Sequence, residues 1–254
     1  MVCATFRFYE ELNDFLAPAR RRHEFSVPCA RAATTKHMIE ALGVPHSEVE
    51  LILVNGESVG FDRRLDDGDR VAVYPRFEAF DISPLLRVRE QPLRVTRFVA
   101  DAHLGGLARL LRIAGFDTLY RNDYQDRAMV DIAEREGRIV LTRDRDLLKH
   151  RGITHGCHVR SLKPAQQFRE IIERLNLRGS IRPFAVCLRC NAPLRAIDKQ
   201  QVLERLPPSV RANRQHFTTC DRCQRIYWQG SHWQRMQELL IDATSASDAH
   251  FPSK

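Results

Sequence analysis

The chain has 254 residues, of which 43% are hydrophobic and 28% charged, and its formal net charge at pH 7 is +8. This apolar content is enough to bury a core, and the length suggests two domains, or three if some are small. Because no apolar run reaches membrane-spanning length and no N-terminal stretch has the pattern of a secretion signal, we expect a cytoplasmic protein with no membrane partner.

Residues 1–80 are predicted to form a small β-grasp domain. Strands in ATFRFY and HEFSVP precede a helix that begins at Thr34 or Thr35 and ends at Leu42, and Asn55-Gly56 joins two further apolar runs as a hairpin. The order resembles that of ubiquitin-like sulfur carriers, but the chain continues as PRFEAFDIS where a carrier needs a terminal Gly-Gly. We therefore expect an interaction or RNA-positioning module, followed by a linker at residues 81–93.

Residues 94–180 alternate short β runs with helices, which indicates an α/β domain with a largely parallel sheet. The expected strands lie in LRVTRFVAD, FDTLY, RIVLT and CHVRSL, and the expected helices lie in HLGGLARLLRIAG, in DRAMVDIAEREG and after Pro164. In such folds ligands bind beyond the carboxyl ends of the strands, so the residues that follow each strand are candidates for a site.

Four aspartates occupy such positions. Asp101 ends the first strand, Asp144 and Asp146 follow the third in the sequence TRDRD, and Asp126 begins the helix between them. If the strands are neighbours, these carboxylates converge on one pocket suited to Mg²⁺ or Mn²⁺, which would activate water for phosphodiester hydrolysis. Each aspartate alone also fits a structural role, since Asp101 and Asp126 can cap helices and the other two can stabilise a turn or pair with neighbouring arginines.

The most specific chemical pattern is a pair of CxxC motifs, CLRC and CDRC, separated by 29 residues. Cys187, Cys190, Cys220 and Cys223 have the spacing of one tetrahedral zinc site with four thiolate ligands. Such a shell leaves no open position for substrate, so the zinc would be structural. We expect a zinc ribbon at residues 181–240 and a disordered tail at 241–254.

Basic charge is concentrated in the middle and C-terminal parts of the chain. Residues 81–181 contain 19 basic and 13 acidic side chains, and residues 182–235 contain 10 and 3. This excess suggests a polyanionic partner, most simply RNA, although a solvated basic surface is the alternative. The arginines that we expect to contact RNA, single-stranded or structured, are Arg109, Arg112, Arg143, Arg189, Arg222 and Arg225.

The segments FVADAHLGGLARLLRIAGFDTLY, DIAEREGRIVLTRDRDLL and CDRCQRIYWQGSHWQRM resemble the Mut-seven-C RNase domain family. That resemblance implies a PIN-like nuclease fold joined to a zinc ribbon, and the N-terminal segment resembles the ubiquitin-like domain often fused to it in bacterial proteins. It also implies that Asp101, Asp126, Asp144 and Asp146 are the catalytic, metal-binding acids.

Two functions follow from these observations. The first is a metal-dependent ribonuclease that uses the four aspartates and grips RNA with its ribbon. The second is a catalytically weak RNA-binding or adaptor protein whose ubiquitin-like domain recruits a protein partner.

Overall fold

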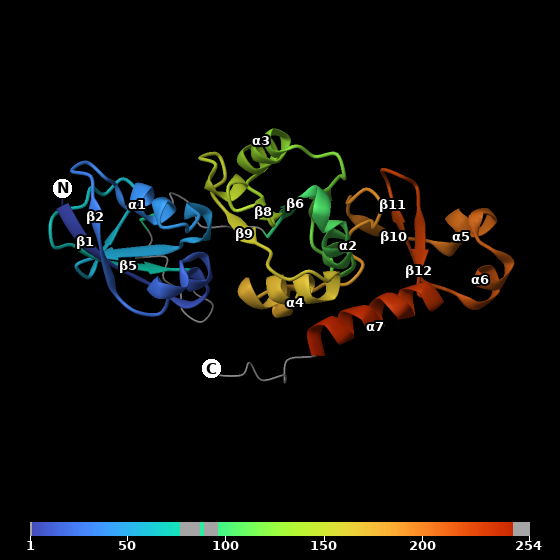
Figure 1. Ribbon diagram of the computed structural model, residues 1–254. Coiled ribbons are helices and arrows are strands. Elements are labelled where there is room, and N and C mark those ends of the chain that lie inside the picture. Colours follow the sequence, from blue (N-terminus) through green and yellow to red (C-terminus); the bar gives the residue numbers. More distant parts are fainter. Residues whose placement is uncertain (1, 77–86, 89–95, 246–254) are drawn as a thin grey trace. The chain divides into compact units, whose positions relative to one another are not determined.

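The computed structural model describes residues 2–76, 87–88 and 96–245 (Figure 1). Most of the predicted linker at 81–93 therefore lies outside the described residues, as does the predicted tail from residue 246 onward. Residues 241–245, which we expected in a disordered tail, continue the last helix, α7 (Ser231–Ser245). Within the described ranges, none of the helices is long and apolar enough to cross a bilayer.

The N-terminal residues form a β-grasp sheet of five strands in the order β2-β1-β5-β3-β4. Its strands are β1 (Val2–Phe8), β2 (Phe25–Cys29), β3 (Leu51–Val54), β4 (Glu57–Val59) and β5 (Arg70–Tyr74). The central pair β1 and β5 is parallel, whereas the other pairs are antiparallel. The predicted hairpin turn is present at Asn55 and Gly56, whose φ angles of 52° and 88° suit the tight turn between β3 and β4.

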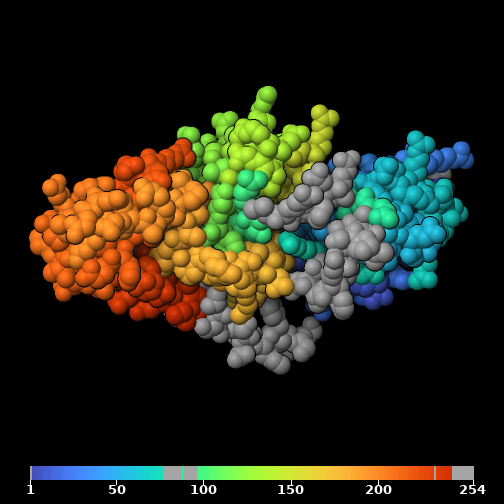
Figure 2. Space-filling model, turned by 180° about the vertical axis from the view of Figure 1, so that it is seen from behind, coloured from blue at the N-terminus to red at the C-terminus, as the bar shows by residue number. Residues whose placement is uncertain are grey.

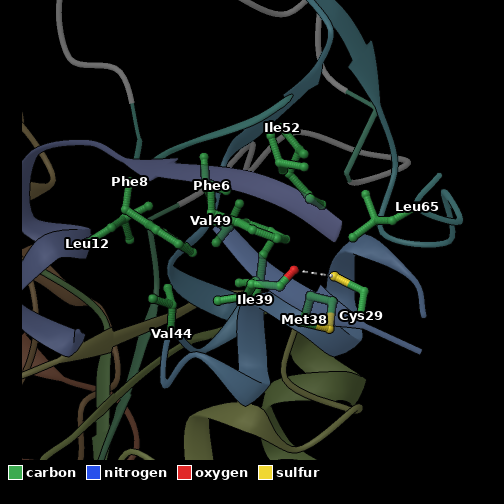
Figure 3. Close-up of a cluster of buried hydrophobic side chains, with 14 of the residues drawn as sticks. Phe6, Phe8, Leu12, Cys29, Met38, Ile39, Val44, Val49, Ile52 and Leu65 are labelled. Carbon is green, nitrogen blue, oxygen red and sulfur yellow. Dashed lines mark hydrogen bonds between the residues drawn. The ribbon is translucent and has the colours of Figure 1, made fainter. Parts of the chain in front are cut away.

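Helix α1 (Thr35–Ala41) crosses this sheet and closes its core. The Thr34 hydroxyl accepts a hydrogen bond from the backbone N–H of His37, which is the N-cap that the sequence predicted. Every second residue of β1 points to the helix, so Phe6 and Phe8 are buried against Ile39 and neighbouring aliphatic side chains (Figure 3). A single apolar face on each element thus accounts for the fold of this part.

The middle of the chain forms a four-stranded sheet in the order β7-β6-β8-β9, and β8 and β9 pair in parallel, as expected for an α/β domain. Its strands are β6 (Phe98–Ala100), β7 (Thr118–Tyr120), β8 (Ile139–Thr142) and β9 (Gly156–His158). The helices are α2 (Gly105–Ile113), α3 (Asp126–Glu136) and α4 (Pro164–Arg174). All residues of β6 and β8 are buried, which explains why these strands read as continuous apolar runs.

The cysteine-containing segment forms a three-stranded antiparallel sheet with short helices. Its strands are β10 (Leu194–Ile197), β11 (Phe217–Cys220) and β12 (Ile226–Trp228), and its helices before α7 are α5 (Lys199–Val202) and α6 (Pro208–Asn213). The segment, orange to red in Figure 2, has a small core in which Val202, Leu206 and Phe217 are buried. Val186, Met236 and Leu240 are also buried in this segment.

The chain divides into two compact units that do not follow the predicted sequential domains. One unit contains residues 1–99 and 124–159, and the other contains residues 100–123 and 160–254. In the second unit the cysteine-containing segment is anchored to the end of α2, where the N–H of Arg182 donates to Ala114 O and the N–H of Phe184 donates to Ile113 O. The domain boundaries expected from the sequence stay predictions.

Gly115 makes this anchor possible, and its replacement by alanine should be costly. Its φ is +96°, and a Cβ there would lie 1.9 Å from the carbonyl oxygen of Arg182. We expect Gly115→Ala to destabilise the protein by at least about 2 kcal/mol, from left-handed strain and the backbone clash, lowering Tm by roughly 4–8 °C. Gly179→Ala is the control in thermal unfolding, because a Cβ at Gly179 meets open space; equal shifts for both variants would contradict this account.

Candidate metal centre and nucleic-acid groove

The four predicted cysteines come together. Their sulfur atoms all lie within 4.8 Å of one another, with Cys187 Sγ 3.5 Å from Cys223 Sγ and Cys190 Sγ 3.4 Å from Cys220 Sγ. A tetrahedral ion with metal–sulfur bonds of about 2.3 Å places its sulfurs about 3.8 Å apart, so the cluster needs little adjustment to fit one. Among the described residues, this is the one group of three or more histidine, cysteine or acidic side chains close enough to hold a metal ion.

Each CxxC pair lies in a tight backbone knuckle. The N–H of Asn191 donates to Cys187 O, and the N–H of Gln224 donates to Cys220 O, at 2.9 and 2.8 Å. Asn191 and Gln224 both have positive φ angles, 63° and 56°, which turns the chain sharply after the second cysteine of each pair. The two pairs therefore present their sulfurs from equivalent turns.

Protein groups prepare one thiol in particular for metal binding. Burial raises the pKa of Cys187, but hydrogen bonds from the Tyr227 hydroxyl, 3.1 Å from Sγ, and from backbone N–H groups outweigh burial and lower this pKa to about 6. Burial instead raises the pKa of Cys190 to about 12. A metal ligand must be the thiolate, and the hydrogen bonds that lower the pKa of Cys187 favour that form of its side chain.

The first knuckle is fixed to the α/β part of its unit by buried polar contacts. Arg112 on α2 donates through Nε to Thr118 O at 2.9 Å and through Nη1 to Leu188 O at 3.2 Å. The Asn191 side chain accepts from the Thr118 N–H at 2.8 Å and donates to the Asp117 carboxylate. Arg112 is 8% exposed and its guanidinium donates to these carbonyl groups, so it has a structural role here, and the RNA contact expected of Arg112 stays a prediction.

A basic groove with aromatic walls runs along the cysteine-containing module. It has a volume of about 1490 Å³ and includes three of the predicted RNA contacts, Arg109, Arg189 and Arg225. Lys199 and His216 add basic groups, Asp198 contributes one acidic side chain, and the aromatic lining is Phe184, Phe217, Tyr227, Trp228 and Trp233. Alternating cations and aromatic rings are the combination that binds phosphates and stacks bases of single-stranded nucleic acid.

The two tryptophans of the groove lining, Trp228 and Trp233, also have packing roles. Trp233 stacks on Phe184 with ring centres 5.4 Å apart, and Trp228 packs against the small core that contains Phe217. Both rings are only partly buried, so each supports the module with one part and lines the groove with another. Of the other predicted arginines, Arg222 is exposed outside the groove lining, and Arg143 is exposed while its carbonyl accepts from His158 Nε2 at 3.1 Å.

The four predicted catalytic aspartates lie at the ends of the strands and at the start of the helix to which the sequence assigned them. Asp101 follows β6 and is partly exposed, and Asp126 is the exposed first residue of α3. Asp144 and Asp146 follow β8, which neighbours β6 in the sheet. They do not form a tight cluster of ligand atoms like that of the cysteines.

The loop after β8 uses its aspartates to hold a turn. Asp144 Oδ1 accepts from the N–H of Asp146 at 2.8 Å and from that of Leu147 at 3.4 Å, and the Asp144 N–H donates to Thr142 Oγ1. Asp146 pairs with Lys149 at 3.0 Å but stays exposed. The turn role that the sequence left open is thus present, and it engages one oxygen of Asp144.

Sequence reasoning missed two residues of the metal module. Neither Asn191 nor Tyr227 was expected to support the cysteine cluster, although the position of Asn191 directly after Cys190 is a signal for a knuckle residue. Neither contact is encoded locally, because Asn191 bonds to Asp117 and Thr118, and Tyr227 bonds to Cys187. Only the folded arrangement brings these partners together.

The geometry defines an α/β protein with an N-terminal β-grasp sheet and a C-terminal module that carries four cysteines close enough together to hold one metal ion. The chain belongs to the family described as Mut7-C RNAse domain, whose model matches residues 96–240. Residues 1–81 match a second family model, described as Mut7-C ubiquitin.

The individual proteins that resemble this chain match smaller parts of it than the family model does. The human exonuclease mut-7 homolog is 34% identical over 109 residues, which are 39% of this chain and 12% of the human protein. The chain thus spans only a small fraction of that relative. Two crystal structures of small archaeal modifier protein 1 from Haloferax volcanii, each 18% identical with a TM-score of 0.25, cover 30% and 31% of this chain and 100% and 99% of their own.

The cysteine cluster predicts one tightly bound metal ion per chain. We expect Cys190→Ser and Cys220→Ser each to lose that metal and to expose the module to protease, because the free energy of metal binding at a structural site contributes to folding. Elemental analysis of the purified protein checks this. Cys3→Ser is the matched control, because Cys3 is exposed on β1, and it should retain the full metal content; retention in all three variants would contradict the assignment.

Proposed function

We propose that this protein is a metal-dependent ribonuclease that binds RNA in the groove of its cysteine-containing module. The observation that carries the proposal is the position of Asp101 after β6 and of Asp144 and Asp146 after β8, adjacent strands within the segment matched by the Mut7-C RNAse domain. Residues that follow neighbouring strands are where α/β folds place their ligand sites.

The donor set suits Mg²⁺ or Mn²⁺, because it consists of carboxylate oxygens on partly or fully exposed side chains. Mg²⁺ commonly takes one or two carboxylates together with waters and substrate phosphates, so a tight protein cluster is not required. Asp101, Asp126, Asp144 and Asp146 would hold such an ion, which supplies activated water and neutralises charge at the scissile phosphate. The turn at Asp144 orients that carboxylate in advance.

For the cysteine cluster we propose a structural zinc ion. Four thiolates in two CxxC knuckles are the typical zinc donor set, and the closed shell leaves no position for substrate. Zinc would then fix the walls of the groove, because Leu188 and Arg189 lie between the first two cysteines and both line it.

The nuclease proposal predicts loss of turnover without loss of RNA binding. Asp101→Asn and Asp144→Asn should each reduce cleavage of labelled single-stranded RNA by roughly 100-fold or more, because metal-assisted charge stabilisation contributes several kcal/mol. Asparagine at residue 144 retains the oxygen acceptor for the turn. The assay compares Mn²⁺ and Mg²⁺ with EDTA, and Asp131→Asn, an exposed position on α3, serves as the control.

A second candidate is an RNA-binding adaptor with weak or no catalysis, whose ubiquitin-like domain binds a protein partner. It is favoured by one observation: Asp144 and Asp146 already have structural partners in the turn. Equal trace cleavage by wild type and both asparagine variants would reject the nuclease and support the adaptor.

The groove itself predicts where RNA affinity resides. Replacing both Arg189 and Arg225 by alanine should weaken single-stranded RNA binding and reduce the slope of log K against log salt concentration by about 1.4, since each phosphate contact contributes about 0.7. Arg222→Ala removes one positive charge outside the groove lining; although the sequence also suggested an RNA contact for Arg222, binding in the groove predicts that this variant leaves the slope unchanged. Fluorescence anisotropy over a salt series measures both, and an equal loss from Arg222→Ala would place binding elsewhere.

A further inference from the structure

Two polar side chains of the β-grasp domain are buried against the segment that follows β8. They lie on the 3-10 turn His46–Glu48, where Ser47 Oγ donates to Leu148 O at 2.9 Å and Glu48 Oε1 accepts from the N–H of His158 at 2.5 Å. Ser47 is 3% exposed and Glu48 is 9% exposed. Both contacts lie within one compact unit of the chain.

An aromatic contact reaches the aspartate loop itself. The ring of Phe15, from the 3-10 helix Glu10–Phe15, lies 5.5 Å from the ring of His158, and the Arg145 guanidinium lies 5.2 Å from the Phe15 ring centre. His158 Nε2 is hydrogen-bonded to Arg143 O at 3.1 Å. The two arginines on either side of Asp144 are therefore each connected, directly or through one side chain, to the β-grasp domain.

The contact is close as well as polar. A Cβ added at Gly156 would lie 2.9 Å from Ser47 Oγ and 2.4 Å from Leu148 Cδ2, so β9 approaches the turn without room for a side chain. The contact therefore buries a hydroxyl and a carboxyl group together with hydrogen-bond partners from the segment after β8, in exchange for their hydration. If the β-grasp domain were attached to the rest of the chain only through a linker, no interface would require a buried Ser47 and Glu48.

We propose that the ubiquitin-like domain braces the loop at residues 142–148, with Ser47 and Glu48 as positioning residues that fix the turn carrying Asp144 and Asp146. The domain would then be an internal support for the candidate catalytic loop, in addition to any external partner it binds. Order in the loop follows from the contacts alone, whereas the consequence for catalysis rests on the proposed nuclease function.

Hydrogen exchange of the full-length protein tests the brace. The reporters are the amides of Asp146 and Leu147, which bond to Asp144 and not to either substituted side chain. In Glu48→Ala we expect their exchange to accelerate roughly tenfold to hundredfold, since a hydrogen bond to a charged group stabilises by about that factor. Ser47→Ala should have a smaller effect in the same direction, and Glu48→Gln, which keeps an acceptor oxygen, should restore slow exchange.

The matched control is Ser26→Ala, which removes a hydroxyl bonded to Thr5 inside the β-grasp sheet and should leave the loop unchanged. Amides of the β-grasp sheet, such as that of Asn55, report whether the domain itself remains folded in each variant. Unchanged exchange at Asp146 and Leu147 in Glu48→Ala, with the β-grasp sheet still protected, would overturn the brace.

Cleavage assays on the same variants separate this proposal from the nuclease proposal. If wild type cleaves RNA, Glu48→Ala should lower the rate while RNA affinity stays constant, because the groove belongs to the other unit, and Glu48→Gln should recover it. If wild type does not cleave, the nuclease proposal fails while the exchange rates still decide the brace. If Glu48→Ala accelerates exchange in the loop but leaves the cleavage rate unchanged, the brace is supported and its proposed contribution to catalysis is rejected.

Discussion

Arg112 on α2 has a buried guanidinium that hydrogen-bonds to backbone carbonyls of β7 and of the first CxxC knuckle. Its Nε and Nη1 groups donate to Thr118 O and Leu188 O, and Asn191 adds a reciprocal contact from the knuckle. A guanidinium is always charged and has five fixed donors, so several carbonyls around it satisfy a group that would be costly to bury alone. The position of the cysteine-containing module on α2, and therefore the presence of Arg109 in its groove, depends on this interaction.

A metal ion in the cysteine cluster would further stabilise the module that Arg112 attaches to α2. Two kinds of contact can add to the small apolar cluster of the module: polar docking to α2 and β7, and an ion held by its four sulfurs. Leu188 and Arg189 belong to both, since their carbonyls face Arg112 while they lie between two cysteine ligands. Metal binding and the shape of the groove are consequently coupled through a segment of only two residues.

Local signals in the sequence were sufficient for most elements and for the cysteine cluster. The Thr34 cap, the Asn55-Gly56 turn and the two CxxC spacings each depend on neighbouring residues, and the structure confirms them. Arg112 could not be distinguished from Arg109 in this way, because both lie on α2 and only the distant carbonyl of Leu188 decides which one is buried. The brace at Ser47 and Glu48 was equally invisible, since its partners are about a hundred residues away along the chain.

The function of the loop after β8 depends on whether Asp144 can bind a metal ion while it also stabilises a turn. A carboxylate that serves a turn is not thereby excluded from metal binding, because it has two oxygens and about four lone-pair sites, and the turn engages only Oδ1 of Asp144. Pre-orienting a ligand in this way lowers the entropy lost when the ion and substrate arrive. A protein that only binds RNA through its cysteine-containing module would not need Phe15, Ser47 and Glu48 to support this turn. The buried contacts to this loop therefore favour a role for it in which the exact position of the carboxylates matters.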